Sequence, residues 1–97
     1  MGEHVWKFPL PNPGSTDPWV VMPKGAVPLH VAAQDGIGYL WAQVDPDAPK
    51  VRRYVVVYGT GPEWPIDGSP MYLGTLHIDW TVWHVFFGME SLEVPDA

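Results

Sequence analysis

The sequence predicts a small all-β domain, either a sandwich or a partly open barrel of about seven short antiparallel strands. Twelve prolines and ten glycines are spread over 97 residues, and the longest stretch free of both runs from Thr75 to Phe87. Proline ends a helix and glycine weakens one, so the chain leaves little room for helices. Six tryptophans supply apolar surface for a core and exclude disorder. The length allows one domain, residues 1–97.

The first strands are short and are separated by proline-rich turns. Val5–Leu10 alternates between polar and apolar residues, and the overlapping segment Pro9–Ser15 forms a long loop. Trp19–Met22 forms a second strand, which stops at a turn beginning with Pro23. Val27–Ala33 forms the third strand. Strict alternation divides its side chains into two faces, Val27, Leu29 and Val31 on one and Pro28, His30 and Ala32 on the other.

Two predicted turns define the strands in the middle of the chain. Asp35-Gly36 predicts a tight hairpin that leads into the strand Tyr39–Val44. The segment Asp45–Pro49 is a turn or short loop. Val51–Tyr58 is the clearest strand in the sequence. Alternation places Val51, Arg53, Val55 and Val57 on one face and Arg52, Tyr54, Val56 and Tyr58 on the other.

The last two strands form a hairpin. Gly59–Pro70 is a loop rich in glycine and proline, and Met71–Ile78 and Thr81–Phe87 pair around Asp79-Trp80. Gly88 is expected to end the last strand. The ordered part then covers about residues 4–88, and residues 89–97 form a frayed acidic tail.

Charge and composition limit the compartments and partners. Eleven acidic residues against five basic ones give a net charge of −6, which argues against binding nucleic acid in general and double-stranded nucleic acid in particular. Without cysteine there are no disulfides or thiolate metal sites, and a reducing cytosol is expected. No segment reads as a secretory signal or as a membrane span of about 18 apolar residues. We expect a cytoplasmic protein with no membrane partner.

Short motifs follow one another in a fixed order along the chain. They are Trp6-Lys7-Phe8-Pro9-Leu10, Met22-Pro23-Lys24-Gly25-Ala26, Leu40-Trp41-Ala42-Gln43-Val44-Asp45-Pro46, Gly59-Thr60-Gly61, Tyr72-Leu73-Gly74-Thr75 and His84-Val85-Phe86. In this order they resemble a family of small proteins of unknown function found in phage and prophage genomes. The resemblance implies a β-rich, phage-associated protein in the cytoplasm of a bacterial host, with no known active site. Two loops, between Leu10 and Trp19 and around Glu63–Pro65, are longer than is typical of that family.

Side chains that could carry chemistry are few and scattered. The four histidines, His4, His30, His77 and His84, form no recognisable metal motif. No nucleophile motif surrounds the hydroxyl residues Ser15, Ser69, Thr60 and Thr75. Gly59-Thr60-Gly61 could expose backbone amides to a phosphate, but Pro62 removes an amide and favours a plain turn. The sequence therefore predicts neither an enzyme nor a metal or cofactor.

The richest cluster combines aromatic rings with arginines. If the Asp45–Lys50 connection closes a hairpin, Trp41 and Gln43 lie beside Arg52, Tyr54 and Tyr58 on one sheet surface. Aromatic faces stack on a nucleobase with about 1–3 kcal/mol each, and arginine binds phosphate. The candidate ligand-binding residues are Trp41, Gln43, Arg52, Arg53, Tyr54, Tyr58 and His84. In the alternative interpretation, Trp41 and Tyr54 belong to the core and Arg52 only solubilises its strand.

These observations lead to three functional hypotheses, given in order of preference. In the first, the chain is a non-catalytic phage-type binding protein, a counter-defence sponge that sequesters a small anionic nucleotide used as a host immune signal. The alternative is a protein–protein inhibitor or a minor virion component that docks through an acidic surface and exposed tryptophans. A small hydrolase of a signalling nucleotide is a third hypothesis. Trp19, Trp64 and Trp80 lie at strand ends or in loops, so we expect exposed indoles and either a homo-oligomer or a host protein partner.

Overall fold

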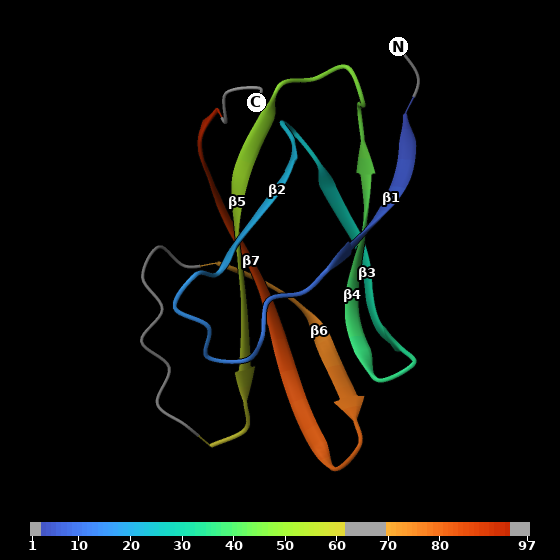
Figure 1. The fold of residues 1–97 in the computed structure, drawn as a ribbon, viewed down its shortest axis with the longest axis vertical. Helices are drawn as coiled ribbons and strands as arrows, with labels where there is room; N and C mark the ends of the chain where they lie inside the picture. The colour runs from blue at the N-terminus through green and yellow to red at the C-terminus, as the bar shows by residue number, and fades with distance from the viewer. Residues whose placement is uncertain (1–2, 62–69, 94–97) are drawn as a thin grey trace.

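The computed structural model describes residues 3–61 and 70–93, and within them the chain is all β. It forms seven antiparallel strands in two sheets, without a helix in these two segments (Figure 1). The predicted fold class is therefore confirmed, as a sandwich. The strands are β1 (His4–Pro9), β2 (Trp19–Pro23), β3 (Val27–Gln34), β4 (Ile37–Val44), β5 (Lys50–Gly59), β6 (Met71–Ile78) and β7 (Thr81–Glu93). None of the described segments forms a helix that could cross a membrane.

The two sheets enclose one apolar core. The smaller sheet has the order β1-β4-β3 and the larger has the order β2-β5-β7-β6 (Figure 1). Alternating side chains of both sheets face inward, as expected for a sandwich. The largest fully buried side chains include Met22, Leu40, Val44, Val55 and Val85. Partly buried Trp6 and Phe8 pack against this core from β1.

The edge strands β3 and β6, one from each sheet, pack against each other and form a seam between the sheets. A Cβ atom added to Gly74 in β6 would lie 2.8 Å from Cγ2 of Val31 in β3, closer than any ordinary contact. The β6 ladder also shifts register between Tyr72 and Gly74. A glycine at a bulge therefore lets the two edge strands approach each other.

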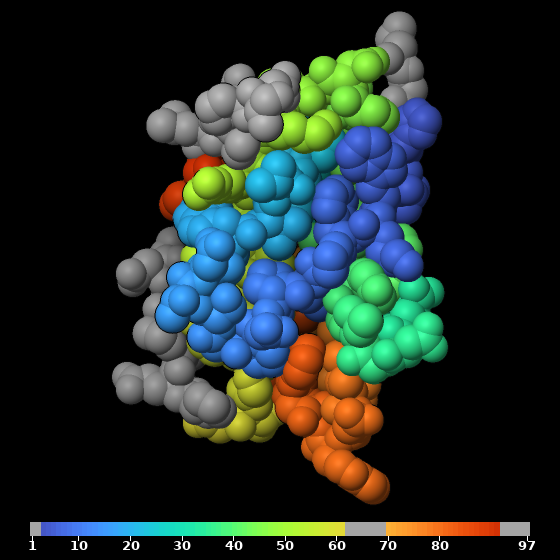
Figure 2. Space-filling model, viewed as in Figure 1, coloured from blue at the N-terminus to red at the C-terminus, as the bar shows by residue number. Residues whose placement is uncertain are grey.

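Both predicted hairpin turns are present. Asp35 and Gly36 have φ angles of 52° and 77°, and Gln34 pairs with Ile37. Two positive φ angles in a two-residue loop are the mark of a type I′ turn. The β6–β7 hairpin turns at Asp79, where φ is 54°, and it extends past neighbouring strands at one end of the molecule (Figure 2).

Alternation in β3 departs from the prediction. Val31 is buried, but Val27 and Leu29 are exposed rather than on the same inward face. A register shift between Pro28 and His30 leaves Leu29 as an extra residue. This bulge changes the phase of the alternation, and a strict period of two could not anticipate it.

The connection between β4 and β5 is the expected short loop, but the hairpin on which the aromatic–arginine cluster depended does not form. Asp45–Pro49 does not close a hairpin, because β4 belongs to the smaller sheet and β5 to the larger one. The short segment instead carries the chain from one layer to the other. Consequently β4 and β5 present their outward side chains on opposite sides of the sandwich.

The last strand is longer than predicted. We expected it to end at Gly88, but β7 continues to Glu93, with Arg53 paired to Glu90 and Val51 to Glu93. Gly88 lies within the strand, where Tyr54 occupies the space that a side chain would need; a Cβ atom there would lie 2.8 Å from Cδ2 of Tyr54. The glycine marks a close approach and not a strand end.

Candidate functional site

The outer face of the larger sheet brings distant polar and aromatic residues together. His84 in β7 lies directly opposite Tyr58 of β5 on one side and Thr75 of β6 on the other. Its neighbour Val85 belongs to the core, so alternation turns His84 and Phe86 outward. Strand pairing thus builds a cluster from segments up to about 26 residues apart in the sequence.

This cluster lines a hollow with a volume of about 470 Å³. It lies at the C-terminal end of β5, beside residues within β6 and β7, and it is large enough for a small molecule. The described residues that line it are Tyr58, Gly59, Thr60, Gly61, Tyr72, Thr75, His84 and Phe86.

Hydrogen bonds join four of these residues into a chain, here called the hydroxyl–imidazole chain. Thr60 Oγ1 lies 2.7 Å from His84 Nε2, and Thr75 Oγ1 lies 3.0 Å from His84 Nδ1. The hydroxyl of Tyr72 is hydrogen-bonded to Thr75 Oγ1. Both imidazole nitrogens therefore have a hydroxyl partner, which fixes the orientation of the ring.

Aromatic rings form the apolar part of the hollow. The centroids of Tyr72 and Phe86 lie 5.5 Å apart with the planes tilted by 54°. Phe86 is buried, whereas Tyr72 is 55% exposed. The hollow thus combines a firm apolar floor with an accessible ring, an arrangement that suits a flat ligand.

The described lining of the hollow carries no Lys, Arg, Asp or Glu side chain. Burial raises the pKa of the Tyr58 hydroxyl above its ordinary value, and nearby Tyr54 raises it further. Tyr58 therefore remains uncharged at neutral pH. The polar groups on offer are hydroxyls and an imidazole, which can both donate and accept hydrogen bonds.

Of the seven residues expected to bind a ligand, Tyr58 and His84 line this hollow. Tyr54 lies on the same outer face but lines a separate hollow of about 200 Å³ beneath the proline-rich loop. Its ring packs edge-on against Trp19, with centroids 5.2 Å apart. Arg52 is exposed near the opposite end of β5.

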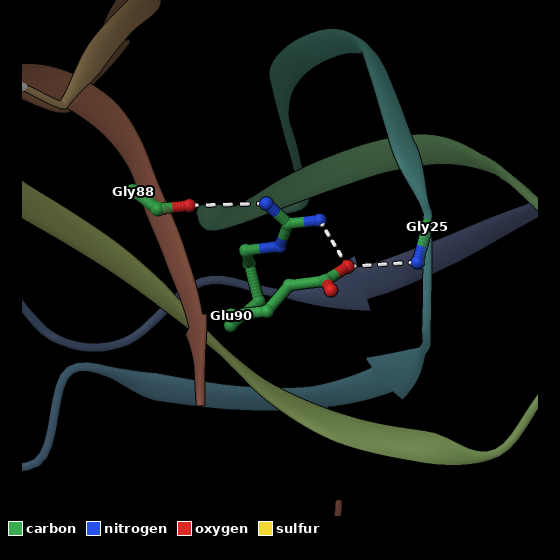
Figure 3. Close-up of polar contacts among 4 residues, drawn as sticks. Gly25, Gly88 and Glu90 are labelled. Carbon is green, nitrogen blue, oxygen red and sulfur yellow. Dashed lines mark hydrogen bonds and ion pairs between the residues drawn. The ribbon is translucent and has the colours of Figure 1, made fainter. Parts of the chain in front are cut away.

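Arg53 is largely buried, and its guanidinium is held by Gly88 and Glu90, whose contacts are drawn in Figure 3. Its Nη1 donates to the backbone oxygen of Gly88 at 3.1 Å, and its Nη2 donates to Glu90 Oε1 at 2.5 Å. Its guanidinium also lies over the Phe87 ring, 4.5 Å from the centroid. Burial lowers the pKa of Arg53, although the Glu90 carboxylate opposes this effect. The side chain is committed to the fold.

Trp41 and Gln43 lie on the opposite side of the sandwich from Tyr58. In β4 they face outward with Tyr39, while Leu40 and Ala42 are buried. Trp41 packs near His30 and Tyr39, with centroids 6.0 and 6.1 Å away. The structure therefore separates the predicted cluster into an outer patch on β4, an internal arginine and the hollow.

The sequence-based candidate set left out six described residues of the hollow: Gly59, Thr60, Gly61, Tyr72, Thr75 and Phe86. Two signals were available, since Tyr72 and Thr75 occur together in one motif and Thr60 stands between two glycines at a strand end. What was missing is the register, because only the pairing of β7 with both β5 and β6 brings His84 to the threonines. In the described parts of the chain, no group of three His, Cys, Asp or Glu side chains could hold a metal ion.

The described residues define a class: a seven-stranded antiparallel sandwich with a hollow on the outer face of its larger sheet, whose described lining is aromatic and hydroxyl-rich and carries no Lys, Arg, Asp or Glu. The chain belongs to the family described as Domain of unknown function (DUF7352), which matches residues 1–94. No curated protein and no solved structure matches the chain.

Proposed function

We propose that the protein is a binding protein for a small uncharged molecule with a planar ring, such as a nucleoside, held in the hollow beside His84. The observation that carries this proposal is the combination of an aromatic floor with four hydrogen-bonded polar groups in one concave site. Aromatic and apolar walls with a few convergent polar groups are typical of small-molecule sites.

The aromatic side chains supply the affinity in this proposal. A ring that stacks on Tyr72 gains about 1–3 kcal/mol, the range measured for bases on aromatic side chains. Hydroxyls of Thr60 and Thr75 then read the edge of the ligand. Since hydroxyls donate and accept, they suit the mixed edge of a nucleobase or the hydroxyls of a sugar.

The position of the arginines favours an uncharged ligand over the anionic nucleotide first expected. Arg53 is engaged by Glu90, and Arg52 lies six residues before Tyr58 along β5. At roughly 3.3 Å per residue, this is about 20 Å, beyond the length of a nucleoside. A phosphate on a ligand in the hollow would meet no arginine and would have to remain in solvent.

The biological setting is a further part of this proposal. The sequence motifs that resemble phage and prophage proteins support a phage origin and a cytoplasmic location in the bacterial host. In that setting, a small protein that holds a nucleoside-type molecule would act by sequestering it. Sequestration of this kind is the counter-defence role expected from the sequence, except that the protein would recognise the planar ring of the ligand and not its phosphate.

Calorimetric titration with nucleosides and their 5′-phosphates tests the proposal. We expect at least one nucleoside to bind, and we expect its phosphate to bind no more tightly. Tyr72→Ala should weaken binding by about 5–160-fold, equivalent to about 1–3 kcal/mol. Tyr39→Ala removes a similar ring from the opposite sheet and should leave affinity unchanged. Binding to no nucleoside, or equal losses in both variants, would refute the proposal.

One observation favours a second function, the binding of a protein partner. Trp80 at the turn of the β6–β7 hairpin is 101% exposed, and this hairpin projects at one end (Figure 2). Buried tryptophans dominate many protein–protein contacts, so Trp80 could anchor a protein partner or a second copy. Sedimentation of the wild type and of Trp80→Ser tests self-association, since only the wild type should form the larger species. A lysate pull-down with the same pair tests a host partner.

A further inference from the structure

The hydroxyl–imidazole chain has the connectivity of a nucleophile, a base and an orienting group. Thr60 Oγ1 is 2.7 Å from His84 Nε2, within the range in which a hydroxyl transfers its proton to imidazole. On the other side of the ring, Thr75 Oγ1 is 3.0 Å from Nδ1. A hydroxyl nucleophile, a base in contact with it and a group that orients the base are the three parts of a covalent catalyst.

Counting protons shows that these parts are compatible. A neutral imidazole has one N–H, so one nitrogen donates and the other accepts. If Nδ1–H donates to Thr75, the Nε2 lone pair accepts the proton of Thr60. The Thr75 hydroxyl then donates its hydrogen bond to the hydroxyl oxygen of Tyr72. All three bonds of the chain are satisfied with Thr60 as the donor to the base.

Thr60 is also accessible to a substrate. It is exposed and stands between Gly59 and Gly61, and a Cβ atom added to either glycine would contact nothing within 4 Å among the described residues. The aromatic floor of Tyr72 and Phe86 lies in the same hollow. An aryl group can therefore pack in the hollow with its ester carbonyl near Thr60.

We infer that Thr60 is an activated hydroxyl that accepts an acyl group from aryl esters, with His84 as general base and Thr75 as a positioning residue. Thr60 Oγ1 attacks the ester carbonyl as its proton moves to His84 Nε2. The bond from the carbonyl carbon to the aryl oxygen then breaks, and the aryloxide leaves with the bond's electron pair. The proton on Nε2 passes to the aryloxide or to solvent, which restores neutral His84. Water hydrolyses the acyl-Thr60 ester by the same steps. No oxidant, metal or cofactor is needed.

This activity goes beyond the proposed binding function. Binding gains its affinity from the rings of Tyr72 and Phe86, with hydroxyls as hydrogen-bonding groups, whereas acyl transfer also requires Thr60 to act as a nucleophile and His84 as its base. The orienting group is a neutral hydroxyl instead of a carboxylate, so it stabilises the imidazolium less than a buried aspartate does. We therefore expect acylation in a single turnover and slow release of the acyl group.

p-Nitrophenyl acetate is the probe for this inference, with nitrophenol release and intact mass as readouts. The expected result is one acetyl group per chain, mapped by peptide mass spectrometry to Thr60. Thr60→Val should abolish labelling at this position, and Thr60→Ser should retain it. His84→Gln should slow labelling by about 10²-fold, the lower end of general-base contributions. Thr81, an exposed threonine outside the hydroxyl–imidazole chain, is the internal control and should remain unlabelled.

The role of Thr75 needs a readout that a loss of packing would not produce. Thr75→Val should slow acetylation of Thr60 at least tenfold, and Thr75→Ser, which restores the hydroxyl, should recover most of the rate. Acetyl groups found only on lysines, the N-terminus or His84, at equal rates in the wild type and Thr60→Val, would overturn the inference. That outcome would leave nucleoside binding intact, so the two proposals fail separately.

Discussion

Arg53 Nη2 lies 2.5 Å from Glu90 Oε1, and the same carboxylate oxygen accepts a hydrogen bond from the backbone nitrogen of Gly25 at 2.7 Å. One oxygen atom therefore ties β5 and β7 to the turn that leads from β2 into β3. Because β2 and β3 belong to different sheets, this turn is a crossing between the layers. The ion pair therefore connects these strands to the crossing, and its contacts are drawn in Figure 3.

The first prediction concerns the stability that this ion pair provides. Only 14% of the Arg53 side chain and 24% of the Glu90 side chain are exposed, so water replaces either partner poorly. Arg53→Met should lower the free energy of unfolding by about 1–3 kcal/mol, below the loss for fully buried pairs. The midpoint of thermal unfolding should fall by about 4–8 °C for each kcal/mol. Differential scanning calorimetry measures both.

Arg52→Met is the matched control for this prediction. Arg52 is the exposed neighbour in the same strand, and a surface substitution of this kind changes stability by about 0.5 kcal/mol at most. Equal destabilisation by Arg52→Met and Arg53→Met would contradict an internal role for the ion pair. Glu90→Gln should also destabilise, since it removes the charge but keeps the oxygen that Gly25 contacts.

The second prediction concerns Gly88 in the middle of β7. A Cβ atom there would lie 2.8 Å from Cδ2 and 3.1 Å from Cβ of Tyr54, and the latter atom cannot move without the backbone. Gly88→Ala should therefore cost about 1–3 kcal/mol, as overpacking does. Gly59→Ala is the control, because its added methyl would meet none of the described residues. Urea unfolding should show a lower midpoint for Gly88→Ala alone.

The strands and hairpin turns could be predicted because neighbouring residues in the sequence determine them. Asp35-Gly36 specifies its hairpin through the φ angles of two adjacent residues, and alternation in β5 correctly separates the core residues Val55 and Val57 from Tyr54 and Tyr58. The errors arise where distant residues decide. The bulge at Leu29 and the continuation of β7 beyond Gly88 depend on partner strands that the sequence pattern does not contain.

The candidate site was harder to predict for the same physical reason. The sequence identified Tyr58 and His84 but joined them to Trp41 through a hairpin that does not form. Arg53 was assigned to a ligand because its type favours phosphate, yet its partner Glu90 lies 37 residues away in a segment expected to fray. Thr60 and Thr75 become candidate site residues only because β7 places His84 between them, within hydrogen-bonding distance of both.

The third prediction concerns the seam between β3 and β6. Gly74→Ala should drive a methyl group into Val31, where Cγ2 is only 2.8 Å away, and should destabilise the protein by about 1–3 kcal/mol. Val31→Ala alone should also destabilise, because it leaves a cavity at a buried position. In the double variant the new methyl has room. A double-mutant cycle should thus give a coupling of at least about 0.5 kcal/mol, and strict additivity would show that the strands do not meet at these residues.

The fourth prediction concerns alkaline pH and Tyr58. Burial and Tyr54 raise the pKa of Tyr58 in the folded protein above the value of about 10 in an unfolded chain. Above about pH 10 the unfolded state then loses this proton more readily than the folded state, so unfolding becomes more favourable. The stabilisation from neutral Tyr58 is complete below about pH 10 and is lost as pH rises through the raised pKa.

Tyr58→Phe isolates this effect, because phenylalanine keeps the ring and removes the titrating group. Thermal unfolding midpoints measured from about pH 8 to about pH 11 should fall steeply at the upper end for the wild type and less steeply for Tyr58→Phe. Tyr39→Phe, on the opposite sheet, should follow the wild-type curve. Parallel curves for the wild type and Tyr58→Phe would mean that the environment of Tyr58 does not favour its neutral form, and the hollow would then be more open to water than its geometry indicates.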